Sequence, residues 1–505
     1  MKKYLKFIPF IFTILIRIPD FFQPYWYTDT GIYSAIGESL NHGAVLYRNI
    51  IDNKPLFIYY VYAYLERIPV SLMYSTQFVS LIFALGTEYL IYKIANLKFN
   101  YKVSVLSCAV FSILVGSNLL HSNGGNAETF FMFFAALSIY IYILKEESDK
   151  HKYQYIYLSG LILGLGVLFK VNVLFDGFFI ILYIFFIYKF REFFKRSSIY
   201  SLGVITPVIL FLLYELSISN FGNTIKYTFL NNFSYVSKFN QFYGISLVDI
   251  NILVFFILIV GSFYLYKKAK ITIGSIFLIL WSLSDAFIVI ITGRPYIHYL
   301  LQLALPLSLL FGYSIYSLFY IPKYKRYLNI LMVLVFGSLY MMYFFRNELA
   351  WQAYGNFTNT IPFYTNFILL VDGSISKTQY YNNFLYNTNV VFEKHSSSAN
   401  INYTMAKLVD SANAKGKDIF LQANFPWVYY ITGTYSTYYY TTDFLYGHNV
   451  SFEKKILNAL SSHHPYVILY YNDGINFPGF FSFVHRYYYY SMSSDGAALY
   501  KLKSS

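Results

Sequence analysis

Residues 155–190 read YIYLSGLILGLGVLFKVNVLFDGFFIILYIFFIYKF, an apolar stretch in which Lys170, Asp176 and Lys189 are the only charges. An apolar run of roughly 18 residues or more is typical of a transmembrane helix, which satisfies its own backbone hydrogen bonds where water is absent. The stretch is long enough for two spans, and Lys170 predicts a break between them. Similar runs recur along the chain, so we expect a polytopic α-helical membrane protein.

The composition excludes most other classes of protein. Of the 505 residues, 57% are hydrophobic and only 12% are charged, whereas soluble domains have about 25% charged residues. An ordinary soluble enzyme and a disordered chain are therefore excluded. The single cysteine, Cys108, leaves no disulfide framework and no zinc site made of thiolates.

The net charge of +14 does not indicate a nucleic-acid-binding protein, because the basic residues form small clusters between apolar runs. The clusters occupy alternate loops, which the positive-inside rule assigns to the cytoplasm. We therefore expect a multi-pass protein of the cell membrane, with a cytoplasmic N-terminus and an extracytoplasmic C-terminal domain. The clusters are Lys2, Lys3 and Lys6; Lys93, Lys98 and Lys102; Lys145, Lys150 and Lys152; Lys189, Arg191, Lys195 and Arg196; Lys267, Lys268 and Lys270; and Lys323, Lys325 and Arg326.

Hydropathy predicts about eleven transmembrane helices within a domain of residues 1–345. Residues 21–69 form the first outer loop, which we expect to contain interfacial amphipathic helices. The predicted spans are 3–20, 70–94, 102–119, 127–145, 155–170, 171–190, 198–219, 247–266, 271–292, 298–320 and 327–345.

After residue 345 the pattern changes to apolar runs of strand length that alternate with helix-like segments. Such alternation is typical of an α/β domain. We therefore expect residues 346–505 to form an extracytoplasmic α/β domain. The expected strands are 367–371, 418–423 and 466–471, and the tyrosine runs 438–440 and 487–490 are also interpreted as strand residues.

Ionisable residues at the outer membrane edge are the candidates for chemistry, because charge is costly in a bilayer. Each also has a structural interpretation. Asp29 can cap the helix that follows it, Glu128 can be a first-turn acid, and Lys54 can be an interfacial lysine. Lys170 requires a phosphate, a carboxylate or water as its partner.

Two further pairs of residues are candidates. Arg294 and His298 are four residues apart, so a helical turn would place them on one face. His298 can alternatively be an interfacial histidine that bonds a carbonyl group. Asp176 and Asp285 are expected to pair with nearby cations.

Three segments resemble the GT-C glycosyltransferases, in particular the branch of protein O-mannosyltransferases and lipid A aminoarabinose transferases. DTGIY at 29–33, followed by LYRNIIDNKPLFIYYVYA at 46–63, resembles their first outer loop. GRPYIHYLLQLALPLSLL at 293–310 resembles their fourth outer loop. The chain from 418 to 473 resembles the outer α/β domain of prokaryotic members.

The resemblance implies a GT-C fold and a membrane glycosyltransferase. Such an enzyme transfers a sugar, for example a hexose such as mannose, from a polyprenyl- or dolichyl-phosphate carrier. The acceptor is an extracytoplasmic protein, lipid or glycan. Together with membrane lipids, the donor and the acceptor are the expected partners, and nucleic acid is not.

The resemblance also assigns roles to the candidate residues. Asp29 is the expected catalytic base, and Glu128 a second catalytic residue that binds the sugar or orients the acceptor. Lys54, Lys170 and Arg294 are expected to bind the donor phosphate. The residues expected to line the donor pocket are Tyr33, His298 and Tyr299.

No cofactor is expected, and no metal site is assigned. A polyprenyl phosphate leaves as a stable anion, so the reaction does not require a metal. Thr30 follows Asp29 where many relatives have a second acid, which argues against a divalent metal without excluding one.

Two other functions remain open at this stage. A lipid or solute transporter or flippase would predict an internal repeat and broken helices near the bilayer midplane, and the sequence shows neither. A non-catalytic surface protein would have no need for the long amphipathic first loop.

Overall fold

The fold is described from a computed structural model of the chain. The structure describes residues 2–144, 152–232, 272–292, 296–320, 349–387, 399–443, 450–472 and 476–503. The chain divides into two compact units, which we describe separately. The first comprises Met1–Ile18, Phe78–Ser217 and Leu230–Thr360, and the second comprises Pro19–Gln77, Ile218–Phe229 and Ile361–Ser505.

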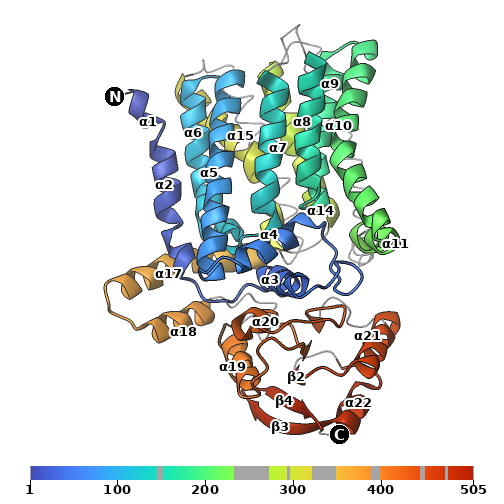
Figure 1. Cartoon of the computed structure of the whole chain (residues 1–505). Coiled ribbons are helices and arrows are strands. Elements are labelled where there is room, and N and C mark those ends of the chain that lie inside the picture. Colours follow the sequence, from blue (N-terminus) through green and yellow to red (C-terminus); the bar gives the residue numbers. More distant parts are fainter. Residues whose placement is uncertain are drawn as a thin grey trace. The chain divides into compact units, whose positions relative to one another are not determined.

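The first unit is a bundle of helices, in which α6, α7 and α8 run alongside one another (Figure 1). Helix α8 packs against both α7 and α10, and α6 packs against α15. Its elements are α1 (Lys2–Leu5), α2 (Ile8–Ile16), α5 (Leu72–Lys98), α6 (Tyr101–Phe111), η2 (Ser112–Gly116), η3 (Asn118–Leu120), η4 (Ser122–Gly124), α7 (Ala127–Leu144), α8 (Lys152–Val167), η5 (Val171–Val173), α9 (Leu174–Ile187), α10 (Phe190–Ser217), α14 (Ile273–Thr292), η7 (Ile297–Leu301) and α15 (Ala304–Tyr320).

The prediction of a polytopic α-helical membrane protein is confirmed. Among the described residues, α5, α7 and α10 are long and apolar enough to cross a membrane, and α6, α9, α14 and α15 lie in shorter apolar helices. The predicted break at Lys170 is confirmed, because α8 ends at Val167 and α9 begins at Leu174. The predicted spans 247–266 and 327–345 lie outside the described residues.

Glycines bring α8 and α10 into close contact. A Cβ atom on Gly160 would overlap the carbonyl oxygen of Tyr200, and one on Gly203 would overlap the carbonyl oxygen of Tyr157. Small residues at a helix crossing let two backbones approach closely, which is typical of helix packing in membranes.

The second unit combines short helices with a four-stranded sheet of order β1-β2-β4-β3 (Figure 1). Strand β1 is parallel to β2, and the other two pairs are antiparallel. The elements are η1 (Ile18–Phe22), α3 (Thr28–Asn41), α4 (Phe57–Glu66), α11 (Phe221–Thr224), η6 (Ile225–Leu230), α17 (Leu349–Val371), α18 (Lys377–Asn387), α19 (Ala399–Asp410), β1 (Phe420–Gln422), α20 (Trp427–Thr432), α21 (Val450–Ser462), β2 (Val467–Tyr471), α22 (Phe480–Tyr487), β3 (Tyr488–Ser494) and β4 (Ala497–Leu502). Elements η1 and α17 begin in the first unit.

The expected strands at 418–423 and 466–471 are confirmed by β1 and β2, and most of 487–490 lies in β3. The prediction of a strand at 367–371 is wrong, because these residues end α17. Phe363, Phe367 and Leu370 recur at helical spacing and pack in one hydrophobic cluster. The run 438–440 is in no named strand and contributes only a single bridge, between Tyr439 and Ile50.

The first outer loop packs with the C-terminal part of the chain inside the second unit. A Cβ atom on Gly31 would lie 2.9 Å from both Pro426 Cγ and Trp427 Cδ1, so this position of α3 accepts only glycine without movement. The indole Nε1 of Trp427 donates a 2.8 Å hydrogen bond to the Tyr27 carbonyl oxygen. The sequence groups this loop with residues 1–345, whereas the compact unit joins it to residues 361–505. The boundary at 345/346 lies outside the described residues and stays a prediction.

Candidate functional site

A buried ion pair joins two of the predicted site residues in the first unit. Glu128 lies in the first turn of α7, and Lys170 follows α8. The Lys170 ammonium group donates a hydrogen bond to Glu128 Oε1. The side chains are only 9% and 2% exposed, respectively. Two charges at this depth stabilise one another, and either would be costly without its partner.

Element η7 brings two more predicted residues to this pair. His298 Nε2 lies 4.0 Å from Glu128 Oε1. The Lys170 Nζ atom lies 4.1 Å from the centroid of the Tyr299 ring, within the range of a cation–π contact. The structure thus gathers Glu128, Lys170, His298 and Tyr299, which we call the Glu128 cluster. Arg294 lies outside the described residues.

The second oxygen of Glu128 gives the cluster a free acceptor. Glu128 Oε2 is buried and accepts no hydrogen bond within the part of the chain that the structure describes. A buried carboxylate oxygen strongly favours a hydrogen-bond donor. The cluster therefore offers a cation and a carboxylate oxygen that can receive a substrate hydroxyl.

The other predicted residues, Asp29, Tyr33 and Lys54, belong to the second unit. Asp29 is in the first turn of α3, one helical turn before the fully buried Tyr33. The Lys54 Nζ atom lies 5.1 Å from the centroid of the Tyr33 ring. Burial raises the pKa of Tyr62, which packs against Tyr33, and the Glu66 and Asp29 carboxylates raise this pKa further.

Sequence reasoning missed Asp52, the partner of Lys54. The Asp52 Oδ2 atom lies 3.7 Å from Lys54 Nζ and accepts a 2.6 Å hydrogen bond from the Tyr59 hydroxyl. Asp52 is 2% exposed, and burial followed by its charge raises the pKa of Tyr59. Nothing in the local pattern DNKP distinguishes Asp52 from a solvated loop acid, so no sequence signal identifies it.

A second pair of acids, Glu38 and Glu66, joins α3 to α4. The Ser34 hydroxyl donates a 2.7 Å hydrogen bond to Glu66 Oε1, and Asn41 Nδ2 donates a 3.4 Å bond to Oε2. Burial raises the pKa of Glu66 well above its ordinary value, and the neighbouring Glu38 raises it further. The pKa of Glu38 is also raised by burial, while His42 opposes the shift.

The expectation that Asp176 and Asp285 pair with cations is wrong for the described residues. Asp176 accepts 2.9 Å hydrogen bonds from the indole of Trp281 and from the Gln302 amide. The same Gln302 amide lies 3.4 Å from Asp285 Oδ1. Neutral donors from α14 and from the start of α15 therefore replace the expected cations.

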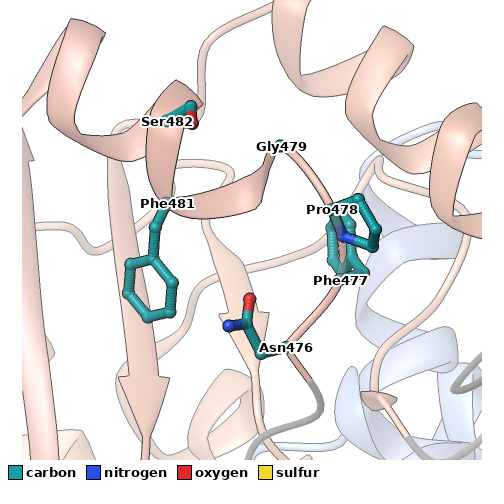
Figure 2. Close-up of a pocket in the computed structure, with 6 residues that line it drawn as sticks. All are labelled: Asn476, Phe477, Pro478, Gly479, Phe481 and Ser482. Atoms are coloured by element: carbon teal, nitrogen blue, oxygen red, sulfur yellow. The ribbon is translucent and has the colours of Figure 1, made fainter.

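A small open pocket in the second unit lies apart from all of these residues. Figure 2 shows Phe481, Asn476 and the Phe477–Gly479 turn around it. None of the predicted site residues lines this pocket, and none of its lining side chains is charged. No group of three or more His, Cys, Asp or Glu residues in the described ranges can hold a metal ion. The expected absence of a cofactor stays a prediction.

Comparison with known families gives one match. Residues 53–214 match the family model described as dolichyl-phosphate-mannose-protein mannosyltransferase. The matched range includes Lys54, Glu128 and Lys170, whereas Asp29 and His298 lie outside it. No curated protein sequence matches the chain.

Two solved structures resemble the whole chain. The crystal structure of ArnT from Cupriavidus metallidurans bound to undecaprenyl phosphate superimposes with a TM-score of 0.58 and 10% identity, over 97% of this chain and 96% of ArnT. The archaeal oligosaccharyltransferase AglB from Archaeoglobus fulgidus, in complex with an inhibitory peptide and a dolichol-phosphate, gives a TM-score of 0.45 and 11% identity. That match covers 99% of this chain and 74% of AglB.

Proposed function

This chain has the GT-C fold, as the resemblance of its sequence predicted, and we propose that it is a membrane glycosyltransferase. It transfers a sugar from a polyprenyl-phosphate carrier to an extracytoplasmic acceptor. The description of the matching family supports this class of donor, as does the undecaprenyl phosphate bound to ArnT. A hexose such as mannose is the proposed sugar.

The observation that carries the proposal is the buried contact of Lys170 with Glu128. An ammonium group has three N–H donors, and Glu128 takes one of them. The remaining donors can bind an oxygen of the lipid phosphate, whose charge needs a cation where water is scarce. Glu128 Oε2 can accept a hydrogen bond from a hydroxyl of the sugar or the acceptor.

The proposed reaction is a displacement at the anomeric carbon of the donor. The acceptor oxygen forms the new glycosidic bond while the bond to the phosphate oxygen breaks, and the phosphate leaves with the electron pair. Asp29 receives the proton of the acceptor hydroxyl. Lys54 and Arg294 are proposed as further phosphate ligands.

The proposal is tested with purified protein in nanodiscs, radiolabelled polyprenyl-phosphate mannose and a membrane extract of the host. Wild type is compared with Asp29→Asn and Lys170→Met. The matched controls are Asp372→Asn and Lys407→Met, which change an exposed acid and an exposed lysine of the second unit. We expect label in the product for wild type and both controls, and loss of transfer of at least about 100-fold for Asp29→Asn.

Two results would overturn parts of the proposal. Full transfer by a folded Asp29→Asn variant would remove Asp29 from the role of base. If folded wild type gives neither transfer nor saturable donor binding, and instead carries the labelled lipid across vesicle membranes, the transporter function replaces the transferase.

A further inference from the structure

Two lysines of the second unit approach one tyrosine ring from different segments of the chain. Lys226 lies in η6 and Lys455 lies in α21. Their Nζ atoms lie 5.5 Å and 5.8 Å from the centroid of the Tyr227 ring. The Lys455 ammonium group also donates a 3.4 Å hydrogen bond to the Tyr227 hydroxyl. Two positive charges are thus held beside the same ring.

A third segment completes this arrangement. The Lys455 Nζ atom lies 3.9 Å from the centroid of the Tyr439 ring. Tyr439 has a φ of 68°, in the left-handed region that a tyrosine rarely occupies. Its backbone is held there by the first outer loop, because its N–H donates to Asn49 O at 3.1 Å and its carbonyl accepts from Ile51 N at 2.6 Å. Backbone strain of this kind tends to accumulate at binding sites.

The two lysines have no counter-ion in the part of the chain that the structure describes. Burial lowers the pKa of Lys455, and the charge of Lys226 lowers it further. The nearest acid across the cluster, Asp52, is already engaged by Lys54 and Tyr59. Glu453 is two residues from Lys455 on α21, so the two side chains do not face each other.

An anion between the lysines would relieve their repulsion. A phosphate monoester carries a charge of about −1.5 to −2 at neutral pH, which matches two ammonium groups better than a single carboxylate does. Lysine binds phosphate as a point charge, and the Tyr227 hydroxyl is a further donor. The geometry therefore favours a phosphate group over a neutral glycan.

We propose that Lys226 and Lys455 form a second anion-binding site, which takes a phosphate group carried by the acceptor substrate. The site is distinct from the Glu128 cluster and uses residues that the proposed reaction does not employ. The inference rests on the proposed function for the word acceptor, whereas the binding of phosphate itself does not depend on it.

The test measures the protection of lysines from acetylation, without any sugar donor. Full-length protein in phosphatidylcholine nanodiscs is treated with an amine-acetylating reagent, with and without inorganic phosphate, and each lysine is quantified by mass spectrometry. Lys377 is the matched control, because it is an exposed lysine 5.6 Å from the centroid of a single tyrosine ring. We expect phosphate to slow acetylation of Lys226 and Lys455 several-fold and to leave Lys377 unchanged.

A second arm identifies the source of the phosphate, and a variant tests the cooperation of the two lysines. Nanodiscs that contain phosphatidylglycerol replace the free phosphate, and protection in this arm alone assigns the site to a lipid headgroup. Lys226→Gln should abolish the protection of Lys455, whereas Lys377→Gln should preserve it.

The inference is overturned if neither arm protects Lys455, or if Lys377 is protected equally. Either result leaves the transferase proposal intact, because the assay contains no donor. Failure of transfer in the radiolabel assay would in turn leave the anion site intact and remove only its assignment to an acceptor.

Discussion

Replacing Lys170 by Met should destabilise the folded protein by about 3–5 kcal/mol, because it leaves the Glu128 carboxylate buried without its cation. Two structural details refine this magnitude. The variant also loses the contact of Lys170 with the Tyr299 ring, which contributes roughly 0.5–2 kcal/mol. In the opposite direction, His298 Nε2 remains 4.0 Å from Glu128 Oε1 and can partly compensate the charge.

The double variant Lys170→Met with Glu128→Gln separates the charge pair from other effects. It removes both charges at once, so no unpaired ion remains in the bundle. Replacing both members of a buried pair is often close to neutral. We therefore expect the double variant to recover most of the stability that Lys170→Met loses, while transfer activity stays low because the phosphate ligand is still missing.

The assay is equilibrium unfolding in mixed micelles with an increasing fraction of sodium dodecyl sulfate, followed by tryptophan fluorescence. The four proteins of the double-mutant cycle give the coupling energy between the two positions. A Lys170→Met variant as stable as wild type would refute the reasoning, as would a double variant less stable than either single variant. Either outcome would mean that the pair is not held together in a site poor in water.

The remaining predictions concern packing and pH. Since burial raises the pKa of Glu66 above its ordinary 4.5, the stability that its protonation contributes is complete below that value and is lost as the pH rises through the folded-state pKa. Glu66→Gln should therefore be more stable than wild type at pH 8, and identical slopes in a pH series of thermal unfolding would contradict this. Gly31→Val should lower the melting temperature because its side chain meets Trp427 at 2.9 Å, by an amount equivalent to about 1–3 kcal/mol; Gly43→Ala, in open space but at positive φ, is the comparison. Gly160→Leu should reduce the yield of folded protein in size-exclusion chromatography, because its side chain overlaps the backbone of α10; a yield equal to that of Gly222→Leu, in open space, would argue against close α8–α10 packing.

The helices of the first unit follow from local features of the sequence. A span is predicted by the hydropathy of its own residues, so α7 and the break between α8 and α9 fall where the apolar runs and Lys170 place them. The strands β1 and β2 follow in the same way from short apolar runs between helical segments. The segment 367–371 departs from this, because Phe363, outside the apolar run, sets the helical face that packs.

Which residues meet depends on contacts that are distant in the sequence. Glu128 and Lys170 are 42 positions apart, and the sequence indicates only that each needs a partner. Nothing local predicts that Asp52 holds Lys54, that Ser34 and Glu38 face Glu66, or that Lys226 and Lys455 approach one ring. The sequence by itself determined a membrane bundle with a mixed α/β region, because hydropathy and periodicity are properties of neighbouring residues. The tertiary structure decided the partners of each charge, because in a medium poor in water a charge is stable only where the packing of distant segments supplies its counter-ion or its donors.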